Sequence, residues 1–127
     1  MIGSTNVRHQ HYAPKSESIC GPLRILSTAR DCSGATVALL EASGLGTHHY
    51  HRETTEFYYV VDGHGDIRLG DEVFPVRPGS FLVVPPNVGH QVMARDGILL
   101  KVLVIASPAW REDDEFVIEA SESASAP

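Results

Sequence analysis

The stretch GTHHYHRETTEFYYVVDGHG, residues 46–65, combines the pattern of a β-strand with a cluster of residue types that bind metals. Its second half, EFYYVVD, is rich in β-branched and aromatic residues and ends at the turn signal DGHG. Its first half places His49 and His51 two positions apart, and alternate residues of a strand point to the same face. His48 and Tyr50 would then point to the opposite face. The stretch predicts a strand pair with two imidazoles on one side.

We expect Arg52–Thr55 to form a turn that reverses the chain. In the resulting antiparallel pair His51 would lie opposite Glu56, and His49 opposite Tyr58. Opposed residues have Cβ atoms about 4.5–5.5 Å apart, so two imidazoles and a carboxylate could converge on one ion. Neutral nitrogen donors with an anionic oxygen suit a first-row divalent cation. The segment therefore predicts a metal site that faces the core.

Short strand-like runs of the same kind recur along the whole chain. Turn signals such as SGLG, RPGS and PPNVG separate runs such as ATVALLEA, SFLVVP and ILLKVLVIA. No helical period accompanies them. We expect an all-β sandwich or barrel, and 127 residues suffice for one domain with its own apolar core.

Composition argues against several classes of partner. The formal net charge of −6 disfavours binding to nucleic acid and to anionic membrane surfaces. No apolar run approaches the roughly 20 residues of a membrane span, and the first 18 residues lack the apolar core of a secretory signal. We therefore expect a cytoplasmic protein, with Cys20 and Cys32 as free or buried thiols.

A second segment, RPGSFLVVPPNVGHQVMA, adds a further histidine and gives the chain a family resemblance. The first cupin signature is His-x-His, a short gap, Glu, and then Gly after six residues; His49, His51, Glu56 and Gly63 fit it. The second signature is Gly, five residues, Pro-x-Gly, two residues, His, three residues, Asn. Gly79, Pro85 and His90 match the second signature. The chain departs from it at Asn87, where the signature has Gly, and at Ala94, where it has Asn. It departs from the first signature at Ser43, where a Gly is expected before the histidines. The sequence thus resembles the cupin superfamily over residues 23–106.

The resemblance implies a double-stranded β-helix, or jelly-roll barrel, and a metal site. Its ligands would be His49, His51, Glu56 and His90, which would hold one divalent transition-metal ion: iron, manganese, nickel or zinc. About two positions of an octahedral ion would stay open for water or substrate. Asn87 is a mild departure, because Asn tolerates the left-handed backbone conformation that Gly supplies.

The reaction is left open by the sequence. One hypothesis is a metal-dependent enzyme that acts on a small oxygen-rich molecule by Lewis-acid isomerisation, epimerisation or elimination. The alternatives are an Fe(II)-dependent dioxygenase and a non-enzymatic small-ligand-binding or sensor module, because fold does not fix function. Tyr58 is the candidate substrate-binding residue, with a core aromatic as the alternative. Val60 and Val92 are expected to form apolar walls of the pocket around the metal site.

The ends of the chain are expected to differ from the barrel. Residues 1–22 would form an arm, residues 23–118 the barrel, and residues 119–127 a disordered acidic tail whose removal should leave melting temperature and metal content unchanged. The run GPLRIL has no obvious hairpin partner, so it could be an edge strand exchanged in a homodimer. The remaining histidines are each more typical of hydrogen-bonded or surface residues than of ligands: His9, His11, His48 and His64.

Overall fold

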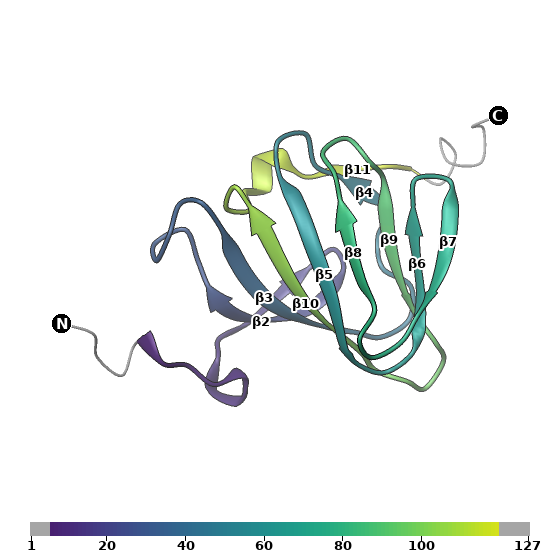
Figure 1. The fold of residues 1–127 in the computed structure, drawn as a ribbon, viewed down its shortest axis with the longest axis horizontal. Helices are drawn as coiled ribbons and strands as arrows, with labels where there is room; N and C mark the ends of the chain where they lie inside the picture. Colours follow the sequence, from purple (N-terminus) through teal and green to yellow (C-terminus); the bar gives the residue numbers. More distant parts are fainter. Residues whose placement is uncertain (1–5, 120–127) are drawn as a thin grey trace.

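Two antiparallel β-sheets face each other in the computed structural model, which describes residues 6–119 (Figure 1). The larger sheet has six strands, in the order β1 (Lys15–Ser18), β2 (Gly21–Ser27), β3 (Thr36–Ala42), β10 (Leu100–Ser107), β5 (Thr55–Asp62) and β8 (Phe81–Val84). The smaller sheet has five, in the order β11 (Phe116–Val117), β4 (His49–Tyr50), β9 (His90–Ala94), β6 (Gly65–Leu69) and β7 (Glu72–Val76). Two short 3-10 helices, η2 (Gln10–Tyr12) and η3 (Glu112–Asp114), complete the described elements. The expected all-β jelly-roll fold is confirmed.

Strand alternation explains which side chains reach the interior. Along β5, Glu56, Tyr58 and Val60 are buried, whereas the residues between them face outward. Inward-facing apolar residues of both sheets form one core, whose members include Leu40, Val60, Ile67, Val84, Val92, Leu100 and Val102. Val60 and Val92 therefore lie inside the barrel, next to the polar residues described below. The core gives the domain apolar burial that does not depend on a metal.

The predicted hairpin between residues 49–51 and 56–58 is wrong. β4 pairs with β9 and β11 in the smaller sheet, and β5 pairs with β10 and β8 in the larger one. The chain thus crosses from one sheet to the other between His51 and Thr55. The backbone N–H groups of Arg52, Glu53 and Thr54 all donate to the carboxylate of Asp114 instead of to a neighbouring strand. His51 and Glu56 consequently meet across the barrel interior and not along a ladder.

The strand GPLRIL has partners within its own chain. β2 pairs with β1 through a hairpin and with β3 on its other side. An ion pair between Arg8 and Asp31, 2.8 Å apart, attaches the segment before β1 to the loop after β2. Strand exchange and the homodimer stay predictions. The predicted disordered tail, apart from Glu119, lies outside the described residues.

Two turns show why particular residues are needed. Asn87 has a φ of 67°, as expected for the position where the cupin signature has Gly, and its N–H donates to the carbonyl of His51 at 2.6 Å. Gly63 has a φ of 86°, and a Cβ at this position would collide with the carbonyl oxygen of Leu99. Within residues 6–119 no helix has the length and apolar character needed to cross a membrane.

Candidate metal centre

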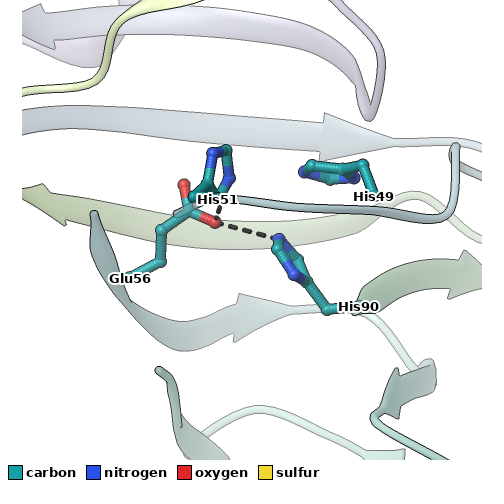
Figure 2. Close-up of side chains that lie close together, drawn as sticks. All are labelled: His49, His51, Glu56 and His90. Carbon is teal, nitrogen blue, oxygen red and sulfur yellow. Dashed lines mark hydrogen bonds and ion pairs between the residues drawn. The ribbon is translucent and has the colours of Figure 1, made fainter. Parts of the chain in front are cut away.

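Four ligand-type side chains meet in the barrel interior. His49 lies on β4, His51 just after it, Glu56 on β5 and His90 at the start of β9. One ligand atom from each lies within 4.8 Å of the others, and no residue of the four is more than 6% exposed. Figure 2 shows them pointing toward one another, with dashed lines from one Glu56 oxygen to His51 and His90. The four predicted ligands are therefore brought together, although by a different route from the predicted hairpin.

Each of the three imidazoles is oriented by a backbone carbonyl. The Nδ1 atom of His49 lies 2.8 Å from the carbonyl oxygen of Thr47. That of His90 lies 3.1 Å from the carbonyl of Val88, and that of His51 lies 3.0 Å from the carbonyl of Asp114. Because a carbonyl only accepts hydrogen bonds, each Nδ1 carries the proton and donates it. In the neutral ring, Nε2 is then left with a lone pair for a metal.

The surroundings of the His51 Nε2 atom indicate whether the site fits a cation. Its Nε2 is completely buried and has no hydrogen-bond partner, although it lies 3.3 Å from Oε1 of Glu56. The same oxygen lies 3.1 Å from Nε2 of His90. A lone pair facing a carboxylate is unfavourable unless a positive charge lies between or beside them. The donor set of three imidazole nitrogens and one carboxylate fits a first-row divalent ion.

Electrostatics in the cluster favour an ionised carboxylate. Burial works against ionisation of Glu56, but the adjacent imidazoles of His51 and His90 outweigh it and hold its pKa well below the usual range. Burial, reinforced by His90, lowers the pKa of His49 to about 4, so this imidazole is neutral at pH 7. For His51, burial is outweighed by Glu56, and its pKa lies above the ordinary value. The site thus contains one negative charge, that of the Glu56 carboxylate, and its imidazoles lie close enough to interact with that charge.

Tyr58, the predicted substrate-binding residue, contacts a ligand residue. Its hydroxyl donates to Oε1 of Glu56 at 3.1 Å, and the side chain is buried. Burial and the nearby Glu56 raise its pKa well above 10, so the hydroxyl keeps its proton. Tyr58 therefore orients the Glu56 carboxylate. Contact with a substrate stays a prediction.

Asp114 is a structural part of the site that sequence reasoning missed. Its carbonyl accepts from His51, and its carboxylate accepts from the N–H groups of residues 52–54 at 3.0–3.2 Å. Burial opposes ionisation, but these backbone donors prevail and lower the pKa of Asp114. Figure 1 shows the yellow C-terminal segment running past the connection between β4 and β5. An acidic residue in the run REDDEF gave no local signal, because its partners lie some sixty positions earlier in the chain.

Two further groups lie beside His49 but outside the group of four. The Sγ atom of Cys20 is 3.8 Å from its Nε2, and Oε1 of Glu115 is 4.0 Å away. Burial, together with Glu56, raises the pKa of Cys20, which stays a thiol. Both cysteines are free, and Cys32 is exposed. His9, His11 and His64 are exposed and His48 is half-buried, and none of them joins the cluster.

Curated relatives match the middle of the chain. A protein of Methanocaldococcus jannaschii described as uncharacterized is 30% identical over 71 residues, which are 56% of this chain and 57% of that protein. The polyketide synthase CurC of Streptomyces cyaneus is 34% identical over 76 residues, which are 56% of this chain and 49% of that protein. The chain thus spans about half the length of the curated relatives that it matches.

Solved structures resemble the fold over most of the chain. A protein from Planctomyces limnophilus superposes with a TM-score of 0.78 at 22% identity, covering 87% of this chain and 94% of that one. A nucleoside dehydratase superposes with a TM-score of 0.75 at 20% identity, covering 87% and 88%. The polyketide cyclase RemF of Streptomyces resistomycificus gives 0.75 at 21% identity, covering 91% and 86%. At these identities the likeness shows the fold alone.

The family model called Cupin domain matches residues 36–106, which include all four residues of the cluster. The match extends over more than half of the sequence and agrees with the jelly-roll topology and the buried His and Glu side chains. The chain belongs to the cupin domain family.

Proposed function

We propose that this protein is a metal-dependent cupin enzyme that acts on a small oxygen-rich molecule by isomerisation, epimerisation or elimination. The observation that supports it best is the common orientation of His49, His51 and His90. Each ring donates Nδ1–H to a backbone carbonyl and so keeps Nε2 free, and the Nε2 atoms of His51 and His90 lie 3.3 and 3.1 Å from the same buried Glu56 oxygen. A structural histidine cluster would not need all three rings held with their Nε2 atoms converging.

The residues of the site would divide the work as follows. His49, His51, Glu56 and His90 would hold one divalent ion, which when bound supplies Lewis acidity to a substrate oxygen. Tyr58 would keep the carboxylate of Glu56 in place through its hydrogen bond. The buried apolar side chains of Val60 and Val92 would limit water around the site and so strengthen its electrostatic interactions.

The neighbours support a reaction in which the substrate is not oxidised. One of the similar structures is a nucleoside dehydratase, and dehydration is an elimination. Another is a polyketide cyclase, and a curated relative is a polyketide synthase. We therefore favour elimination or a related rearrangement of a hydroxylated molecule over oxygenation.

The metal site is tested first, by replacing its ligands. His51→Ala or His90→Ala should abolish stoichiometric metal binding, because removal of one ligand disrupts a set that acts together. Metal content is measured by elemental analysis of protein purified without a nickel column. His64→Ala is the matched control, since this histidine is exposed and outside the cluster.

Two results would contradict the assignment. Full metal occupancy at the same site in His51→Ala protein would show that the ligands are wrong. Loss of the fold on His51→Ala would make the ion structural, although the apolar core should keep the variant folded.

The reaction is tested with protein loaded with iron, manganese, nickel or zinc in turn. Each form is incubated with uronates, polyols, hydroxy acids and nucleosides, and the products are analysed by mass spectrometry and chromatography. Loss of water or formation of an isomer without oxygen uptake is expected. Oxygen consumption coupled to product formation by the Fe(II) form would instead establish a dioxygenase.

A further inference from the structure

A third acidic group stands at the edge of the metal centre. Glu115 lies between η3 and β11, and its side chain is only 16% exposed. Its Oε1 atom is 4.0 Å from Nε2 of His49, the nitrogen that His49 would use to bind a metal. The indole Nε1–H of Trp110 donates to the same oxygen at 3.3 Å. The carboxylate is thus directed at the site from the C-terminal segment.

The position of Glu115 differs from that of the proposed ligands. It is outside the group of four whose ligand atoms lie within 4.8 Å of one another. An independent observation shows that a ligand belongs at this centre: the buried Nε2 of His51 has no hydrogen-bond partner. A molecule bound at the ion on the His49 side would therefore lie next to Glu115, which is not one of the four proposed ligands.

The chemistry of that neighbour restricts what can bind. Burial raises the pKa of the Glu115 carboxyl, against the Trp110 N–H and the nearby imidazoles, which lower it. In its ionised form the carboxylate only accepts hydrogen bonds, so a ligand atom placed beside it must carry a hydrogen. Glu56 contributes one negative charge to the interior, and Glu115 in its ionised form adds a second one beside His49. The basic groups that act on Glu115 are the imidazoles of His49, His51 and His90, all of which the metal would occupy. The divalent ion would attract an anionic ligand, but the two carboxylates would repel that ligand and weaken its binding, whereas a neutral ligand would not be repelled.

We propose that Glu115 is a specificity-determining residue that selects neutral, hydroxyl-bearing molecules over organic acids and other anions. Its carboxylate accepts a hydrogen bond from a hydroxyl of the molecule held at the ion. This inference rests on the metal site of the proposed function and narrows its substrate class. Neutral sugars, phenols and nucleosides fit it, whereas uronates and hydroxy-acid anions do not.

The test compares an anionic and a neutral probe on cobalt(II)-loaded protein. Azide is the anion, imidazole is a neutral ligand with an N–H donor, and both are titrated by visible absorption. Glu115→Gln should bind azide at least about fivefold more tightly than the unchanged protein, because one nearby negative charge is lost. Imidazole should bind no more tightly. Glu112→Gln is the control, since this exposed residue carries the same charge three positions earlier.

Each result decides the inference separately from the metal site. Equal azide affinity in Glu115→Gln and the unchanged protein, with full cobalt content in both, would overturn the role of Glu115 and leave the metal site intact. Loss of cobalt stoichiometry in Glu115→Gln would overturn it too, because Glu115 would then be a ligand. Absence of cobalt from the unchanged protein would refute the proposed function, and the inference with it. Glu115→Ala serves as a second variant and should show the same gain in azide affinity.

Discussion

At the scale of single residues, the centre depends on the groups that orient its ligands as much as on the ligands themselves. Each proposed ligand has a partner: three backbone carbonyls for the histidines and the Tyr58 hydroxyl for Glu56. Such partners fix the tautomer of an imidazole and the orientation of a carboxylate before an ion arrives. The protein therefore bears the ordering cost of the site during folding and not during metal binding.

Tyr58→Phe tests this arrangement with the loss of one oxygen atom. We expect metal affinity to fall by about tenfold, because Glu56 loses a donor that orients it. Stability should change by less than about 1.5 kcal/mol, the usual range for a single hydrogen bond. Competition with a chelating dye measures the affinity, and thermal unfolding measures the stability.

The neighbouring residue provides the control for this variant. Tyr59 is 48% exposed on the outer face of the same strand, so Tyr59→Phe should change neither quantity. An unchanged metal affinity in Tyr58→Phe would reduce Tyr58 to a core aromatic, which was the alternative interpretation of the sequence.

At the scale of elements, the C-terminal segment completes the site. β11 pairs with β4, and Asp114 holds the connection that follows β4. Asp114→Asn should lower the free energy of unfolding by about 1–3 kcal/mol, because one of the two acceptor oxygens becomes an NH2 group that cannot accept from the backbone donors. It should also weaken metal binding, since His51 is bonded to the carbonyl of the same residue.

Asp113→Asn is a matched control for Asp114→Asn. The two residues are adjacent and carry the same charge, but the Asp113 side chain is 80% exposed and pairs with Arg111. Denaturant unfolding and metal titration of both variants give the comparison. If both variants lost the same free energy of unfolding, the contacts of Asp114 with the β4–β5 connection would not stabilise the protein more than an exposed acidic residue does.

The turn between β5 and β6 supplies a second test at this scale. Gly63→Ala should destabilise the protein strongly, because the added Cβ would collide with the Leu99 carbonyl. Gly70→Ala is the control: it also has a positive φ, of 61°, but nothing lies within 4 Å of its added Cβ. The difference between the two melting temperatures isolates the collision from backbone strain. Equal melting temperatures would mean that the loop around Leu99 moves aside at little cost.

These elements also show what the sequence could and could not predict. The inward face of β5 followed from alternation, and the four ligand-type residues followed from the spacing of two signatures. The partner of β4 did not follow, because a short polar connection is compatible both with a hairpin and with a crossing between sheets. The deciding contacts come from Asp114, and local periodicity carries no information about such distant pairs.

At the scale of the whole molecule, an apolar surface favours self-association. Tyr59, Val61, Phe81 and Val83 are 41–60% exposed on the outer sides of β5 and β8, where Tyr59 and Phe81 are cross-strand neighbours. β8 is also an edge of the larger sheet. A second copy that packs on this face would cover both features. This face differs from the N-terminal strand, for which exchange is predicted from the sequence.

Phe81→Glu should therefore convert a dimer into a monomer, as measured by light scattering at micromolar concentration. Leu45→Glu is the control, because Leu45 is 72% exposed and lies on a different segment. A dimer that persists in Phe81→Glu but disappears after removal of residues 1–26, which include GPLRIL, would instead support exchange of the N-terminal strand. A monomer in the unchanged protein would contradict both interfaces.

The contact of His51 with the carbonyl of Asp114 has a consequence for how the protein is made in the cell. A nascent chain that has been synthesised as far as β10 contains all four proposed ligands and most of the strands. It still lacks the carbonyl that orients His51 and the carboxylate that holds the β4–β5 connection. Biogenesis would then have two stages, in which the barrel forms first and acquires its metal only after the segment around Asp114 has docked.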